Sequence, residues 1–160
     1  MKRSAVSIVD ARDPDDMDQV RAMFREYREQ VGDCSCFEGF EDELHTLPGG
    51  YVPPGGCLLL ARDGDELAGG IAMLPLTDGA CEMRRLYVRA RWRGTGLGRR
   101  LVSTLLDHAR AAGHARMVLE TLPRMAEARA LYASLGFVEA PRWQGDPVED
   151  NIYMRLDLVP

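Results

Sequence analysis

The sequence predicts one α/β domain, residues 1–160, built on a mixed central sheet. Two observations predict this class. Three apolar segments separated by short Asp-Gly turns at 63–64 and 78–79 indicate an antiparallel meander. A long amphipathic segment then separates the meander from a further apolar strand, which is the order of a β-α-β crossover. About four helices are expected to flank the sheet, and 160 residues is an ordinary size for a single domain.

Hydrophobic periodicity and turn residues place the individual elements. Asp13 can cap the first helix, Pro14 suits its first position, and Gly32 is a natural stop. The expected helices cover 14–31, 40–47, 96–112 and 128–135. The expected strands cover 5–10, 57–61, 67–76, 81–88, 117–119, 137–139 and 151–158.

Composition narrows the possible partners. Lys plus Arg number 20 and Asp plus Glu 25, so the formal net charge is −5, which argues against nucleic acid. No apolar run has the length of a membrane span or of a signal peptide core. Four Cys are too few for a disulfide framework, and Cys34, Cys36 and His45 lack a second ligand pair with zinc spacing. We therefore expect a cytoplasmic protein without metal, nucleic acid or membrane partners, as a monomer or homodimer.

The segment 89–100 carries the clearest chemical pattern. It joins a strand to a helix and holds three Gly at alternate positions and five Arg. Gly lets backbone approach a ligand closely, and a helix start offers free N–H groups to an anion. A P-loop would need Lys and Ser or Thr where Arg99 and Arg100 follow Gly98. The segment is therefore either a pyrophosphate cradle of another kind or a tight turn with solvated Arg.

Two motifs resemble one known family. Arg91-x-x-Gly94-x-Gly96 matches R/Q-x-x-G-x-G/A, and 128–137 matches A-x-x-L-Y-x-x-L-G-F. On these motifs the chain is similar to the GNAT superfamily of N-acetyltransferases. The segment 81–88 and the Leu-Pro pair at 122–123 look like those of a bacterial branch of this superfamily. The resemblance implies a GNAT-like sheet and direct transfer of acetyl from acetyl-CoA to a primary amine in a ternary complex.

The resemblance also assigns the donor site. Backbone groups of Leu86, Tyr87 and Val88 would contact the pantetheine arm and polarise the thioester carbonyl. Met125 stands where many relatives carry an Asn that touches this arm. The residues implied for the pyrophosphate are Arg91, Arg93, Gly94, Thr95, Gly96, Leu97, Gly98 and Arg99.

Tyr132 is the candidate general acid. It lies on the apolar face of its expected helix, so it could simply be a packed core residue. The family motif around it implies that its hydroxyl protonates the departing CoA thiolate.

Glu82 is the candidate general base. It alternates with Arg84, Leu86 and Val88 on one face of its strand, where a charge is costly unless paired. Two alternatives stay open. Glu82 could simply form an ion pair with Arg84, and the proton of the acceptor could instead pass to Glu120 or to no enzyme group.

The acceptor site is expected between the segment after the first helix and the loop before the last strand. The residues expected to contact the acceptor are Phe37, Phe40, Arg84 and Trp143. Aromatic and acidic side chains suit a cationic small amine, and Arg84 could bind a carboxylate on it, as in an amino acid. The alternatives are a protein or peptide N-acetyltransferase and a non-catalytic acyl-CoA-binding sensor module.

Overall fold

The computed structural model describes residues 5–32, 34–148 and 150–159. Its strands form one seven-stranded sheet in the order β1-β2-β3-β4-β5-β7-β6. The strands are β1 (Val6–Asp10), β2 (Cys57–Asp63), β3 (Glu66–Pro75), β4 (Ala80–Val88), β5 (Arg116–Thr121), β6 (Val138–Glu139) and β7 (Ile152–Asp157). The helices are α1 (Pro14–Val31), α2 (Phe40–His45), α3 (Leu97–Ala111) and α4 (Ala126–Ser134). Short 3₁₀ turns occupy Ser35–Phe37 and Ala90–Trp92.

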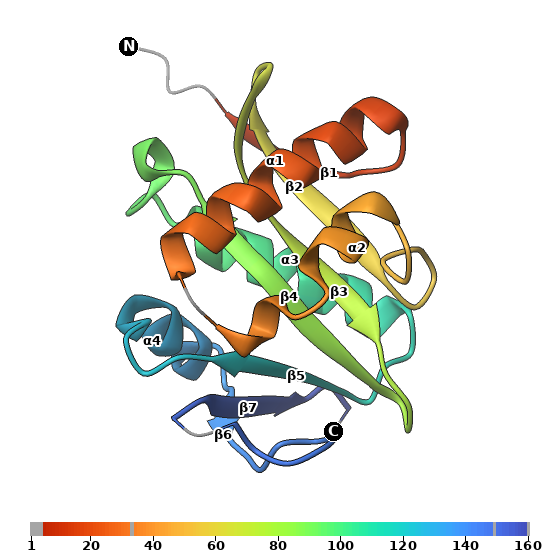
Figure 1. Cartoon of the computed structure of the whole chain (residues 1–160), viewed down its shortest axis with the longest axis vertical. Coiled ribbons are helices and arrows are strands. Elements are labelled where there is room, and N and C mark those ends of the chain that lie inside the picture. Colours follow the sequence, from red (N-terminus) through yellow and green to blue (C-terminus); the bar gives the residue numbers. More distant parts are fainter. Residues whose placement is uncertain (1–4, 33, 149, 160) are drawn as a thin grey trace.

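The predicted fold class is confirmed. Neighbouring strands pair antiparallel except β4 and β5, which run parallel and are joined by the crossover helix α3. Helices α1 and α2 cover one face of the sheet and α3 covers the other (Figure 1). Each face buries its own apolar cluster. No helix in the described ranges is long and apolar enough to cross a bilayer.

The predicted start and end of α1 are also confirmed. The Asp13 carboxylate accepts a hydrogen bond from the Asp16 N–H at 2.8 Å, and the Asp16 carboxylate accepts one from the Asp13 N–H at 3.3 Å. Pro14 occupies the first turn, and Gly32 ends the helix with φ of 79°. These reciprocal caps satisfy N–H groups that the first helical turn leaves without partners.

A β-bulge interrupts β4. Two residues, Arg85 and Leu86, stand opposite the single β3 residue Ile71. Arg85 adopts φ of 61°, in the left-handed region that non-Gly residues seldom occupy. A bulge of this kind bends the strand and redirects the side chains that follow it.

The bulge corrects one sequence prediction. Strict alternation places Glu82, Arg84, Leu86 and Val88 on one face, and this is wrong beyond Arg84. Leu86 and Val88 pack against the cluster under α3, whereas Arg84 reaches Glu43 of α2 on the opposite face. One extra residue is enough to exchange faces because side chains alternate with a period of two.

The sheet opens between β4 and β5. Their parallel pairing covers only 80–82 of β4 and 116–118 of β5. Figure 1 shows the two strands diverging beyond this point, toward the side where α4 lies. Within the described residues, the edge of β4 after Glu82 therefore has no strand on its β5 side. This gap places backbone groups and side chains of both strands around a common opening.

Candidate active site

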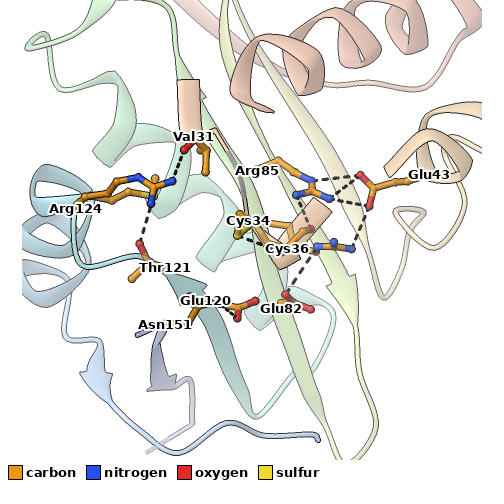
Figure 2. Close-up of a disulfide and its surroundings, with 12 residues drawn as sticks. Val31, Cys34, Cys36, Glu43, Glu82, Arg85, Glu120, Thr121, Arg124 and Asn151 are labelled. Carbon is orange, nitrogen blue, oxygen red and sulfur yellow. Dashed lines mark hydrogen bonds and ion pairs between the residues drawn. A yellow bond between two sulfur atoms is a disulfide. The ribbon is translucent and has the colours of Figure 1, made fainter. Parts of the chain in front are cut away.

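A cleft of about 730 Å³ lies where β4, α3, α4 and the end of α1 approach one another. Most of the predicted donor-site residues line it, namely Leu86, Tyr87, Val88, Arg93, Gly94, Gly96, Leu97, Gly98 and Arg99. Sequence reasoning missed Tyr27 and Arg124, which also line the cleft. Arg124 donates a hydrogen bond to the Val31 carbonyl, so it links the β5–α4 loop to the end of α1 (Figure 2). No local motif marks these residues, because they come from separate segments.

The Gly-rich loop has the backbone geometry of an anion cradle. Gly94 and Gly96 have φ of 76° and 86°, and space beside both Cα atoms is open for at least 4 Å. Gly96 precedes α3, and no side chain caps this helix start. The N–H groups of the first turn of α3 are therefore available to a ligand, with the positive end of the helix dipole behind them.

The loop arginines divide into two groups. Arg93 donates to the Val88 carbonyl at 2.8 Å, and Arg99 donates to the Ser134 hydroxyl at 2.7 Å, both at the cleft. Arg91 instead pairs with the exposed Glu66 at 2.9 Å. Of the predicted donor residues, Arg91 and Thr95 are the ones that do not line the cleft. The Thr95 hydroxyl donates to the Trp92 carbonyl and so stabilises the turn itself.

A second cavity of about 470 Å³ adjoins the cleft. The two share Tyr27, Val31, Leu86 and Met125 as wall residues. Four of the predicted catalytic and acceptor residues line this cavity, namely Glu82, Arg84, Tyr132 and Trp143. The structure thus brings together side chains from β4, α4 and the loop before β7.

Tyr132 reaches this cavity from α4. Its side chain is buried, with 5% of the residue exposed, and packs edge-to-face on Phe137 with ring centroids 6.0 Å apart. Burial raises the pKa of Tyr132, and the nearby Tyr27 raises it further. Its hydroxyl makes no hydrogen bond to any other described residue. Every fully buried polar side-chain atom among the described residues does have a hydrogen-bond partner, so this hydroxyl is not fully buried. The hydroxyl therefore keeps contact with the open space of the cavity.

Two carboxylates face the same cavity from neighbouring strands. Glu82 lies on β4 and Glu120 on β5, and Figure 2 shows them on either side of the gap. Burial raises the pKa of Glu82, the Arg84 cation lowers it, and the Glu120 charge raises it. Glu120 accepts a hydrogen bond from the Asn151 side chain at 2.8 Å. Glu82 thus combines a raised pKa with a place on the cavity wall, and these two properties make it a candidate proton acceptor.

Two adjacent arginines at the bulge share one carboxylate. Glu43 of α2 accepts from Arg85 through both oxygens at 3.2–3.3 Å (Figure 2). Its Oε1 lies 3.2 Å from Arg84 Nη1. Tyr51 donates to the same Oε1 at 3.0 Å and accepts from Arg84 at 3.1 Å. Arg84 Nε also lies 3.8 Å from Glu82. Sequence reasoning missed Glu43 and Tyr51, which lie far from β4 along the chain.

Phe37 and Phe40 do not line the cavity. Both rings are buried in the cluster under α1 and α2. The Arg85 guanidinium lies over them, 5.0 and 5.5 Å from the ring centroids. Trp143 does face the cavity and packs edge-to-face on Tyr153. Phe37 and Phe40 therefore support Arg85, and any effect on an acceptor is indirect.

Two of the four cysteines are joined to each other and two are free. A disulfide joins Cys34 to Cys36, and both line the second cavity. The Cys36 carbonyl accepts from Arg85 Nη1 at 3.3 Å. Cys57 and Cys81 are buried free thiols. The described residues contain no group of three or more His, Cys, Asp or Glu that could hold a metal ion.

Comparisons with known proteins agree on one family. The model of the acetyltransferase (GNAT) family matches residues 17–137. An uncharacterized N-acetyltransferase of Schizosaccharomyces pombe is 37% identical over 160 residues, covering 99% of this chain and 98% of the relative.

Solved structures of this family have the same fold. A GNAT acetyltransferase of Staphylococcus aureus superposes with a TM-score of 0.79 at 17% identity, covering 97% of this chain and all of that one. The yncA protein of Salmonella typhimurium, solved with its cofactor acetyl-CoA, superposes with a TM-score of 0.74 at 22% identity, covering 97% and 95%.

Proposed function

The chain belongs to the GNAT family and is an acetyl-CoA-dependent acetyltransferase, and from this premise we propose that it acetylates a small primary amine by direct attack in a ternary complex. One observation carries the proposal. A single cavity beside the donor cleft holds both a partly buried carboxylate, Glu82, and a phenol, Tyr132, whose hydroxyl makes no hydrogen bond to the described residues. A general base and a general acid are the two groups that accelerate aminolysis of a thioester by proton transfer.

The residues of the cleft fit the donor. The left-handed Gly94 and Gly96 leave open space beside the backbone, and the first turn of α3 directs N–H groups toward an anion. Arg99 adds a cation on the same wall. These features support a pyrophosphate at the loop and a thioester near the opening between β4 and β5.

Glu82 is the base in this proposal. It accepts a proton from the acceptor ammonium, directly or through water, and the freed amine nitrogen attacks the thioester carbonyl carbon. The raised pKa of Glu82 narrows the gap to the pKa of an amine, which makes the transfer less unfavourable. Glu120 is the second candidate, because it lines the same cavity.

Tyr132 is the acid. As the new C–N bond forms and the C–S bond breaks, the departing thiolate takes the proton of the phenol, and the second proton that the amine nitrogen loses restores the phenol, directly or through water. Burial keeps Tyr132 protonated because it raises the pKa of the phenol. Transfer to a thiolate with a pKa of about 8.5 is uphill, so proton transfer has to accompany C–S cleavage.

The size and walls of the cavity favour a small acceptor. A volume of about 470 Å³ falls within the range of small-molecule sites. Trp143 supplies an apolar wall. The charged part of the lining holds three carboxylates, Glu38, Glu82 and Glu120, and three guanidinium groups, Arg84, Arg85 and Arg142, so it can pair with an ammonium and with a carboxylate. A protein tail would also have to thread this cavity, and the assay below compares the two classes.

The test is CoA release from acetyl-CoA with matched panels of amino acids, polyamines and Lys-containing peptides. We expect release with at least one small amine and a large loss of turnover in Tyr132→Phe. Faster release with peptides than with every small amine would overturn the small-molecule proposal. Acetyl-CoA binding by calorimetry without release with any amine would favour the sensor module instead.

A further inference from the structure

Arg84 and Arg85 are consecutive, but their hydrogen bonds differ. Arg85 has 3% of its side chain exposed, and Nε, Nη1 and Nη2 all donate, to Glu43 and to the Cys36 carbonyl. Arg84 has 23% of its side chain exposed and lines the second cavity. Within the described residues its side chain makes one hydrogen bond, from Nη1 to Tyr51. A guanidinium carries five N–H donors, so Arg84 retains donors for a ligand.

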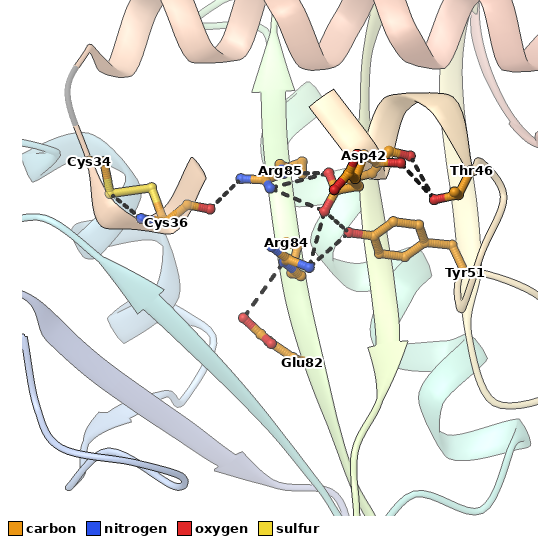
Figure 3. A network of polar contacts seen from close by, with 9 residues as sticks. Cys34, Cys36, Asp42, Thr46, Tyr51, Glu82, Arg84 and Arg85 are labelled. Carbon is orange, nitrogen blue, oxygen red and sulfur yellow. Dashed lines mark hydrogen bonds and ion pairs between the residues drawn. A yellow bond between two sulfur atoms is a disulfide. The ribbon is translucent and has the colours of Figure 1, made fainter. Parts of the chain in front are cut away.

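The contacts of Arg84 fix where those donors lie. Tyr51 and Glu43 hold Nη1 at 3.1 and 3.2 Å from the α2 side. Nε lies 3.8 Å from Glu82 Oε2, which places Arg84 next to the proposed base (Figure 3). The cavity therefore offers a carboxylate-binding fork and a proton acceptor side by side.

We propose that the acceptor is a 2-amino acid, whose carboxylate binds Arg84 while its amine lies at Glu82. This inference rests on the proposed function and specifies the substrate class of the same site. In a 2-amino acid the amine and the carboxylate are attached to the same carbon atom. This arrangement suits a site in which the two binding groups, Glu82 and Arg84, lie next to each other. Arg binds carboxylates through two parallel hydrogen bonds, which also fixes the orientation of the amine.

Other amines match the cavity less well. An amine without a carboxylate leaves the Arg84 donors without partners once the ligand has displaced water, which costs binding energy. An amino acid with its amine at the far end of the chain has to fold back on itself to reach both groups. Both kinds should be poorer acceptors by about 30-fold or more in kcat/KM, as expected when hydrogen bonds to a charged group are not formed.

Matched amines test the inference. Norleucine, its isomer 6-aminohexanoate and pentylamine share a similar chain and differ in the presence and position of the carboxylate. Alanine, 3-aminopropanoate and ethylamine repeat the comparison with a short chain. CoA release should be fastest with the 2-amino acid in at least one set, by about 30-fold or more. Pentylamine and ethylamine matching norleucine and alanine would overturn the inference and leave the proposed function standing. Failure of all six amines and of every other small amine, beside intact acetyl-CoA binding, would contradict both.

Variants of Arg84 make the test specific. Arg84→Gln should raise KM for the 2-amino acid by about 30-fold or more and abolish its advantage over the simple amine, while KM for acetyl-CoA stays the same. Arg84→Lys should recover part of the advantage, because it keeps the charge without the fork. Arg155→Gln is the control, since Arg155 is half-exposed on β7 and pairs with Asp157. An unchanged preference in a folded Arg84→Gln protein would overturn the inference.

Discussion

The proposed donor cleft and the proposed acceptor cavity share a wall but are built differently. At the proposed pyrophosphate site, the donor cleft uses the backbone of one short segment, with Gly94 and Gly96 in left-handed conformations ahead of α3. The acceptor cavity uses side chains from α1, β4, β5, α4 and the loops before α2 and β7. A backbone cradle binds what all donors share, whereas converging side chains can be exchanged one at a time. The comparison therefore predicts donor binding to be general and acceptor choice to be particular to this chain.

The variant with the largest expected effect should lower turnover without changing the affinity for acetyl-CoA. Tyr132 lines the acceptor cavity and is absent from the walls of the donor cleft. Tyr132→Phe should lower kcat by about ten- to ten-thousand-fold, the usual range for loss of a general acid, with acetyl-CoA affinity unchanged. Steady-state CoA release and calorimetry measure the two quantities. A variant within a factor of two of wild type would reduce Tyr132 to a packing role.

A second variant should weaken acetyl-CoA binding through the Gly-rich loop alone. Gly96→Asp places a negative charge at the start of α3, where the pyrophosphate is proposed to bind, and should weaken acetyl-CoA binding by roughly 100-fold. Gly96→Asn is the matched control, because Asn and Asp tolerate the left-handed φ of 86° to a similar degree. The difference between the two variants isolates the charge. Equal affinities by calorimetry would contradict the loop assignment.

The pH dependence of kcat/KM should distinguish the roles of Glu82 and Glu120. Glu82 accepts a proton only when ionised, and burial raises its pKa, so the acidic limb of kcat/KM should lie above the ordinary carboxyl range. Glu120 raises this pKa and Arg84 lowers it. Glu120→Gln should therefore move the limb to lower pH, and Arg84→Gln should move it to higher pH.

Glu82→Gln gives the corresponding control. If Glu82 is the base, this variant should lose the acidic limb of the kcat/KM profile and most of the acetylation rate. If Glu82→Gln keeps the limb and Glu120→Gln removes it, the base is Glu120.

The fold was largely predictable because its signals are local. Periodicity, the Asp13 cap and the Asp-Gly turns placed all helices and strands within a few residues of their observed bounds. The alternation on β4 failed beyond Arg84, since a bulge depends on how β3 and β4 pair and not on β4 alone.

The acceptor cavity was predictable only in part, for the same reason. Glu43 joins Arg84 and Arg85 from α2, about forty residues earlier in the chain, and no spacing rule reveals that contact. Phe37 and Phe40 showed the opposite failure, because an aromatic residue in a predicted pocket segment can equally face the core. The Gly-rich loop was recognisable because all its groups lie within twelve consecutive residues.

The smallest expected effect concerns the arginines of that loop. Arg91 matches the sequence motif but pairs with exposed Glu66 away from the cleft, whereas Arg99 lines it. Arg91→Gln should therefore weaken acetyl-CoA binding less than Arg99→Gln does, and it should change the free energy of unfolding by at most about 1 kcal/mol, the usual scale of exposed ion pairs. Calorimetry with acetyl-CoA and thermal unfolding of both variants test this order. A larger loss of affinity in Arg91→Gln would mean that Arg91 leaves Glu66 for the donor, and that the motif rather than the side-chain positions identifies the binding groups.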